Sequence, residues 1–295
     1  MREPGLVSDQ LHRALSEFAP YREYRAGRLP RARYLDWLKE NAATLEARVG
    51  PRWARLQAPR YPVDFDEQAE RFHADLAARG FVQGEPDKAG FRAFRQRVLS
   101  AWDHADKRTS IQPDEAALLY YLAQARRPRR MLAIGSYYGY FAVWALPAIR
   151  ENGGQATLID PNPDVCALAE RNLAALGFAD CAHTLVECAE DVLEGMAPGI
   201  DLVLLDPNGR PANDPAFRGK GIYALMVHRV FEKMSDGALL VAHNDYSPEI
   251  GPNEMAAELL AGECAKLEGF HAVCAERFRQ SMILPTPEGI GVYLK

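Results

Sequence analysis

Two glycines, three tyrosines and an aspartate lie where they could bind a nucleotide. The apolar run 131–134 ends at Gly135, and Gly139 follows four residues later, where a helical pattern begins. A second predicted strand, residues 155–160, ends in Asp160. In a βαβ unit of this kind, a glycine turn lets the backbone approach a ligand and the acid accepts hydrogen bonds from ribose hydroxyls. These residues predict a ligand with a ribose, although Gly135 and Gly139 could also serve only the geometry of the turn.

The glycine spacing and the neighbouring tyrosines narrow the choice of ligand. The pattern is G-x-x-x-G rather than G-x-G-x-x-G, so the turn is not expected to hold a phosphate. S-adenosylmethionine (SAM) contains a ribose without a pyrophosphate, and its sulfonium is a cation. Aromatic ring faces attract cations, and Tyr137, Tyr138 and Tyr140 lie in this loop. SAM is therefore the expected ligand, with packing as the alternative role of the tyrosines.

The elements that must position these residues follow from the hydrophobic periodicity. Residues 1–108 contain helical patterns without strand alternation, and from residue 111 onward predicted strands alternate with helices. The inner strands are short and apolar throughout, which is typical of parallel strands buried on both faces. We expect an α/β fold: a doubly wound, mostly parallel, seven-stranded Rossmann-like SAM-binding sheet with an α-helical N-terminal extension. The predicted strands are residues 129–135, 155–160, 182–187, 200–206, 238–243, 271–278 and 289–294, and the predicted N-terminal helices are residues 9–18, 31–47, 66–79 and 89–104.

Charge separates the same two regions. Residues 1–108 carry 20 Lys and Arg against 16 Asp and Glu, whereas residues 109–295 carry 15 against 24. We therefore expect residues 1–108 to form an α-helical N-terminal extension or lid, and residues 109–295 to form the SAM-binding catalytic domain.

Polar residues follow the fourth and fifth predicted strands. Asp206 and Asn208 flank a proline after the fourth strand, and His243 and Asn244 end the fifth. Ligands of doubly wound sheets bind beyond the carboxyl ends of the strands, so these four residues and Tyr138 are the predicted catalytic residues. Asp206 and Asn208 could instead form an Asx-type turn, and His243 could be a hydrogen-bonded core histidine.

These motifs resemble the class I SAM-dependent methyltransferases, and most of all the small-molecule O-methyltransferases related to catechol O-methyltransferase. The resemblance covers residues 109–295 and implies that Asp160 binds the ribose and that the adenine lies near Ala189 and Glu190. The residues expected to bind SAM are Ser110, Gly135, Ser136, Tyr137, Gly139, Tyr140, Asp160, Ala189 and Glu190.

The chain departs from the metal-dependent members of that family. In those enzymes two aspartates and an asparagine hold magnesium, and a lysine three residues after the first aspartate acts as the base. The corresponding positions here are Asp206, His243, Asn244 and Gly209, so that lysine is absent and one carboxylate is replaced by an imidazole. Magnesium prefers oxygen ligands, so no metal is expected; a zinc-like Asp/His/Asn trio is the alternative.

The segment 206–208 also resembles the Asp-Pro-Pro motif by which related enzymes hold an amine. Oxygens of Asp206 and Asn208 could accept amine hydrogens and direct the lone pair at an electrophilic carbon. We expect the α-amine of SAM to attack its own γ-carbon and give azetidine-2-carboxylate and methylthioadenosine, as in azetidine-2-carboxylate synthases and aminocarboxypropyl transferases of this fold. The alternatives are N- or O-methylation of a small, natural-product-type acceptor, which yields S-adenosylhomocysteine (SAH), and a SAM-binding subunit without catalysis.

Composition indicates the cellular compartment and the classes of partner to expect. None of the five cysteines forms a C-x-x-C pair, which favours free thiols in a reducing cytoplasm. The sequence shows neither a signal-peptide pattern nor an apolar run long enough to cross a membrane. The positive charge of residues 1–108 is dispersed among acids, unlike a nucleic-acid site. We expect a cytoplasmic enzyme that acts on a small molecule, without nucleic-acid or membrane partners, with a homodimer as one assembly.

Overall fold

A seven-stranded sheet forms the centre of the molecule. The computed structural model describes residues 9–210 and 214–295. The strands are ordered β3-β2-β1-β4-β5-β7-β6; β1 to β5 run parallel, and β7 is antiparallel to both of its neighbours. The predicted doubly wound, mostly parallel α/β fold is confirmed. The strands are β1 (Arg130–Ile134), β2 (Gln155–Ile159), β3 (Ala182–Leu185), β4 (Ile200–Leu205), β5 (Met234–His243), β6 (Gln280–Leu284) and β7 (Ile290–Leu294).

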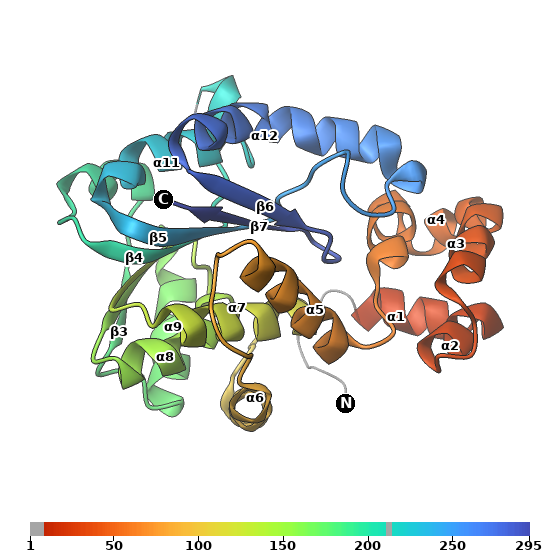
Figure 1. Ribbon diagram of the computed structural model, residues 1–295, viewed down its shortest axis with the longest axis horizontal. Coiled ribbons are helices and arrows are strands. Elements are labelled where there is room, and N and C mark those ends of the chain that lie inside the picture. Colours follow the sequence, from red (N-terminus) through yellow and green to blue (C-terminus); the bar gives the residue numbers. More distant parts are fainter. Residues whose placement is uncertain (1–8, 211–213) are drawn as a thin grey trace.

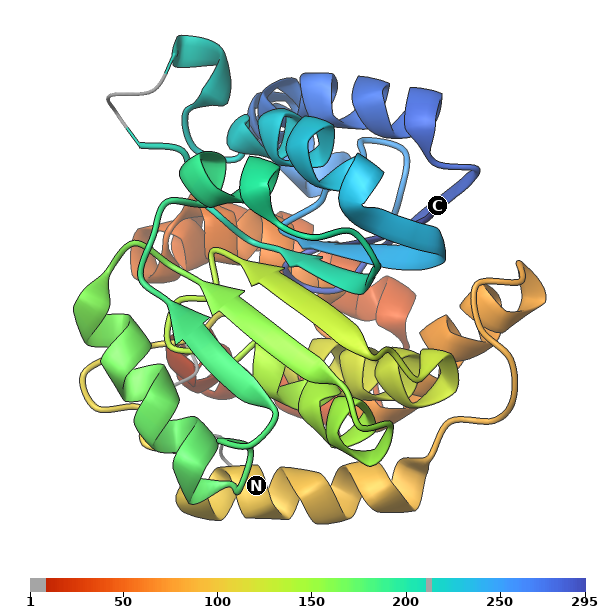
Figure 2. The ribbon, with the colours of Figure 1, turned by 90° about the vertical axis from the view of Figure 1, so that its left-hand side faces the viewer.

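Helices cover both faces of this sheet. Figure 1 shows α11 and α12 on one face and α5 and α7 on the other. Figure 2 shows α6 crossing beneath α9, where the Arg97 guanidinium donates to the Leu176 carbonyl at 2.9 Å. The helices are α1 (Asp9–Ser16), α2 (Ala19–Arg25), α3 (Arg31–Glu40), α4 (Ala42–Val49), α5 (Phe65–Ala78), α6 (Lys88–Ala101), α7 (Pro113–Arg126), α8 (Leu146–Glu151), α9 (Pro163–Ala175), α10 (Ala189–Val192), α11 (Ile222–Val230) and α12 (Ala257–Arg277), with a π-helix at Arg52–Gln57.

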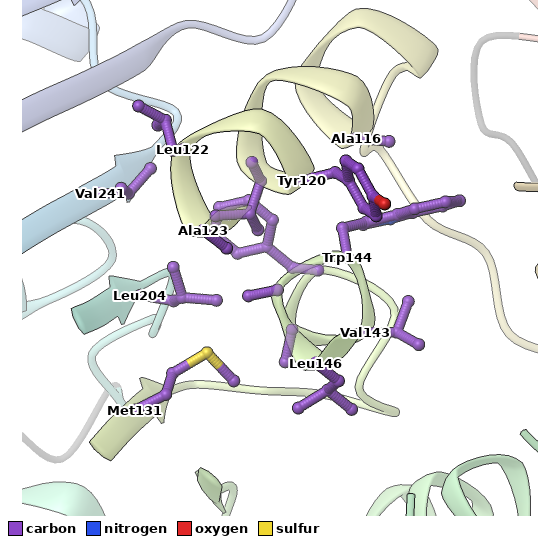
Figure 3. Close-up of a cluster of buried hydrophobic side chains, with 14 of the residues drawn as sticks. Ala116, Tyr120, Leu122, Ala123, Met131, Val143, Trp144, Leu146, Leu204 and Val241 are labelled. Carbon is purple, nitrogen blue, oxygen red and sulfur yellow. The ribbon is translucent and has the colours of Figure 1, made fainter. Parts of the chain in front are cut away.

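Alternate residues of the strands point to opposite faces and so supply two cores. Met131 and Ala133 of β1 belong to the cluster beneath α7, whereas Leu132 and Ile134 belong to the cluster beneath α11 and α12. Figure 3 shows the first cluster, in which Trp144 lies beside Tyr120 of α7, on the side away from the strand residues Leu204 and Val241. Burial on both faces explains why the inner strands are apolar at every position.

The N-terminal region contributes to two separate hydrophobic clusters. Side chains of α5 and α6, such as Phe72 and Phe94, belong to the same cluster as β1 and α7. Residues of α1–α4, such as Leu15 and Tyr34, form a separate cluster, which Figure 1 shows to one side of the sheet, beside the turn between β6 and β7. Only the first part of the predicted extension, up to about residue 61, therefore has a core of its own.

Two predicted elements differ from the structure. The predicted strand at residues 271–278 is wrong, because α12 continues to Arg277 and buries Leu267, Phe270 and Cys274 at helical spacing. The predicted helix 31–47 is two helices, because Asn41 leaves the helical conformation between α3 and α4. Across the described residues, no helix has both the length and the apolar character needed to cross a membrane.

Replacing Trp144 by alanine should lower the free energy of unfolding by about 3–5 kcal/mol. The side chain is 1% exposed and packs against Phe91 and Phe94, so its loss leaves a cavity beside α6. Urea unfolding followed by circular dichroism measures the change. Val186, which is 45% exposed, is the control: Val186→Ala should change the same quantity by less than about 0.5 kcal/mol. Equal effects of the two substitutions would contradict the packing described.

Candidate functional site

A cavity of about 430 Å³ opens beyond the carboxyl ends of β1, β2, β3 and β4. This is the edge at which doubly wound sheets bind ligands, and the volume is within the range of small-molecule sites. The structure brings most of the predicted residues together here. The predicted residues that line this cavity, called the first cavity below, are Ser110, Gly135, Ser136, Tyr137, Tyr138, Tyr140, Asp160, Ala189, Glu190, Asp206 and Asn208.

The glycine loop owes its conformation to packing as well as to the cavity. Gly135 has φ +70°, and a Cβ there would lie 2.4 Å from the Cα of Pro207. Glycine is therefore required because the backbone after β4 crosses directly above β1, and not only because a ligand approaches. Gly139 has φ +85° and does not line the first cavity. Gly139 was predicted to contact SAM; in the structure it serves the turn instead.

Asp160 fixes the loop from the end of β2. Its carboxylate accepts hydrogen bonds from the backbone N–H of Tyr137 at 2.9 Å and of Asn162 at 3.0 Å. The first bond holds Tyr137 at φ 50°, a conformation that a tyrosine rarely adopts. Burial raises the pKa of Asp160, against the lowering effect of the two N–H groups. Asp160 thus organises the loop in addition to its predicted place at a ribose.

One hydroxyl in the first cavity is ready to bind a ligand. Ser136 is 6% exposed, and its Oγ has no hydrogen-bond partner among the described residues. Buried hydroxyls are nearly always hydrogen-bonded. A ligand with polar groups in the first cavity would supply the missing partner.

The three tyrosines differ in their surroundings. Tyr137 is 41% exposed at the mouth of the cavity, whereas Tyr138 and Tyr140 are buried and their rings are parallel to within 17°. The hydroxyl of Tyr138 lies 2.8 Å from Nδ1 of His104, a residue that we did not predict. Burial lowers the pKa of His104 and raises that of Tyr138, so both are neutral at pH 7 and share one hydrogen bond.

Asp206 lies between two cations. One carboxylate oxygen bonds the ammonium of Lys220, with the hydroxyl of Tyr223 at 3.4 Å, and the other lies 3.2 Å from Nδ1 of His243. Nε2 of His243 lies 3.3 Å from a carboxylate oxygen of Glu115. Burial opposes these charges, but Lys220 and His243 overcome it and lower the pKa of Asp206 to about 2. Burial likewise opposes the charge on His243, yet Asp206 and Glu115 raise its pKa to about 10.

His243 and Asn244 do not line the first cavity. His243 is fully buried behind Asp206, so it acts on the site through that carboxylate. Asn244 lines a second cavity of about 510 Å³, together with Lys220, and Asn208 lines both cavities. Lys220 was missed from sequence because it lies 14 residues after Asp206, and a backbone bridge between Gly209 and Gly219 brings it back.

These side chains do not fit a divalent metal ion. Both carboxylate oxygens of Asp206 already pair with cations, and both ring nitrogens of His243 face carboxylates. A protonated imidazole offers no lone pair to a metal, so the zinc-like alternative fails as well. Within residues 9–210 and 214–295, no group of three or more His, Cys, Asp and Glu is arranged to hold a metal.

Part of the chain is similar to proteins of known class. Residues 132–245, from β1 to the end of β5, match the family model described as a methyltransferase domain. A catechol O-methyltransferase of Niastella koreensis is 28% identical over 140 residues, which cover 46% of this chain and 58% of that protein. A catechol O-methyltransferase of Mycobacterium tuberculosis is 33% identical over 111 residues, which cover 37% and 50% of the two chains. The central part of the chain is thus similar to methyltransferase domains, and the chain spans about half the length of these relatives.

Solved structures share the fold. A SAH-bound methyltransferase of Podospora anserina superposes with a TM-score of 0.50 at 21% identity, covering 77% of this chain and 94% of that one. The O-methyltransferase of Bacillus cereus in complex with SAH gives 0.51 at 14% identity, covering 79% and 100%. This chain therefore shares the fold of these solved structures.

His243→Gln should destabilise the protein most at low and neutral pH. Because the folded pKa of about 10 lies above the ordinary 6.5, stabilisation by His243 is complete below about pH 6.5 and is lost as pH rises through 10. Leaving the buried carboxylate of Glu115 without this cation costs about 3–5 kcal/mol, while Asp206 keeps Lys220 as a partner. Urea unfolding of both proteins at pH 6, 8 and 10 should show a difference that shrinks toward pH 10. A difference independent of pH would mean that His243 is neutral.

Proposed function

We propose that this protein is a SAM-dependent methyltransferase that methylates an oxygen of a small-molecule acceptor. The observation that carries this proposal is the pair of cavities on either side of Asn208. The first contains the residues predicted to bind SAM, and the second leaves room for another molecule next to it. The likeness of residues 132–245 to methyltransferase domains supports the same conclusion.

The lining of the first cavity suits SAM. Asp160 would accept the ribose hydroxyls, Glu190 and Ala189 would lie at the adenine, and Ser136 would bond the amino-acid part through its unpartnered hydroxyl. SAM supplies an activated methyl group. The protein's own contribution is to hold the two molecules in line and to keep water out of the contact between them.

Cyclisation of SAM, the reaction favoured by the sequence alone, has less support. It needs Asp206 to hold an amine, but the oxygens of Asp206 already bond Lys220 and His243. A SAM amine would have to share this carboxylate with two cations. A protein that cyclises SAM also has no use for a second cavity. The relatives named above are O-methyltransferases, so methyl transfer, the alternative stated above, is the better proposal.

Asp160→Ala should weaken SAM binding by about 1–3 kcal/mol, because ribose hydroxyls lose their acceptor. Titration calorimetry with SAM measures this change. Asp164→Ala is the matched control: this exposed aspartate lies in the first turn of α9, outside the cavity. Unchanged affinity of Asp160→Ala would exclude Asp160 from the SAM site.

Mass spectrometry of the products decides between the two reactions. We expect SAH to form when SAM and 1,2-dihydroxybenzene are both present, and SAM to remain intact when it is alone with the protein. Methylthioadenosine formed from SAM alone would overturn methyl transfer in favour of cyclisation. Binding of SAM without any product, across acceptors bearing hydroxyls and amines, would favour a subunit that only binds SAM.

A further inference from the structure

Lys220 is a cation held in place between the two cavities. Its ammonium bonds the carboxylate of Asp206 and lies 3.3 Å from the backbone carbonyl of Asp206 and 3.4 Å from that of Pro207. The ring centroid of Tyr223 lies 5.1 Å from it. Its side chain is only 11% exposed, yet it lines the second cavity. Few lysines are so constrained, because the flexible side chain usually extends into solvent.

More cations than acids line the second cavity around Lys220. Asp206 and Tyr223 contact it, and His243 stands behind Asp206 as a second cation. Arg52, Arg218 and Lys266 also line the second cavity. Its lining includes one acid, Glu263, which pairs with Lys266 at 3.0 Å and lies 3.8 Å from Arg52. An anion that entered this cavity would meet cations on several sides.

We propose that Lys220 binds the nucleophilic oxygen of the acceptor in the second cavity and stabilises it as an anion, taking the part that a divalent cation plays in other transferases. This inference rests on the proposed methyl transfer. The argument is one of position. Lys220 bonds one carboxylate oxygen of Asp206 and His243 faces the other, and Lys220 lines the cavity next to the predicted SAM site. Lys220 would thus contact the reacting atom, with Asp206 and His243 as its positioning residues.

The transfer step balances without another reactant. The acceptor hydroxyl loses its proton to bulk water through the open cavity, and the oxyanion pairs with the Lys220 ammonium. The oxygen then forms a bond to the methyl carbon while the sulfur–carbon bond breaks, and the sulfur keeps the electron pair as a neutral thioether. Lys220 stays protonated throughout, so it is neither the base nor a leaving group.

Ionisation of a coloured acceptor tests this role without turnover. The probe is 4-nitrocatechol, whose phenolate absorbs visible light, bound to the full-length protein saturated with SAH. Because an opposite charge in contact favours the ionised form, the bound probe should ionise about one pH unit or more below the free probe. Lys220→Met should abolish this shift, and Lys220→Arg should retain most of it. Lys233→Met, at a lysine whose ammonium bonds the Glu194 carbonyl outside both cavities, is the matched control and should behave as wild type.

Each other result overturns the inference in a distinguishable way. A shift that persists in Lys220→Met, or a failure of SAH-loaded protein to bind the probe, removes Lys220 from the acceptor site but leaves the proposed methyl transfer standing. Stimulation of SAH formation by Mg²⁺, or its loss in EDTA, removes the metal-free role. Failure to bind SAM or to form SAH with any acceptor refutes the proposed function itself.

Discussion

The pairing of Asp206 with Lys220 and His243 is the interaction on which the site depends. It begins a run of alternating charges, because His243 in turn contacts Glu115, and buried charges are tolerated only when each has a partner. Glu115 lies in the first turn of α7 and also accepts the hydroxyl of Thr286 at 2.5 Å. The run therefore fixes α7, the ends of β4 and β5 and the turn before β7 relative to one another. A change at any member alters the charge at the cavity wall, even where that member never meets a ligand.

The same turn joins the N-terminal region to the site. Glu288 is 3% exposed, and its carboxylate bonds Arg52 at 3.0 Å and also the amide of Gln57. Arg52 additionally donates to the hydroxyl of Tyr246 at 2.8 Å and lines the second cavity. Burial opposes its charge, yet Tyr246 and Glu288 raise the pKa of Arg52. The N-terminal helices are therefore attached where an acceptor would bind, a position suited to the predicted lid, and they contribute a cation there.

Features of the site that depend on a local sequence pattern could be predicted, whereas those that depend on contacts between distant residues could not. Gly135 and Asp160 were identifiable because each directly follows a strand, and strand ends meet at one edge of a parallel sheet. Lys220 was not, because only the bridge between Gly209 and Gly219 brings it to Asp206. The wrongly predicted strand at residues 271–278 has a similar origin. A short apolar run fits either a strand or a helix, and here packing against α11 and β7 stabilises the helix. The place of the site could thus be predicted, but its charge balance could not.

That charge balance bears directly on the chemistry. A carboxylate at the end of β4 would suit an amine if its oxygens were free, because it could accept the amine hydrogens. Here Asp206 instead bonds Lys220, which lines the second cavity. The group that Asp206 positions at that cavity is therefore an ammonium. An amine nucleophile gains nothing from an ammonium, and its protonated form is repelled. An oxygen nucleophile gains most in the anionic form, which is also its reactive form. One lysine, held by residues far from it in sequence, thus favours oxygen over nitrogen at a position where the adjacent Asp-Pro-Asn sequence indicated the opposite.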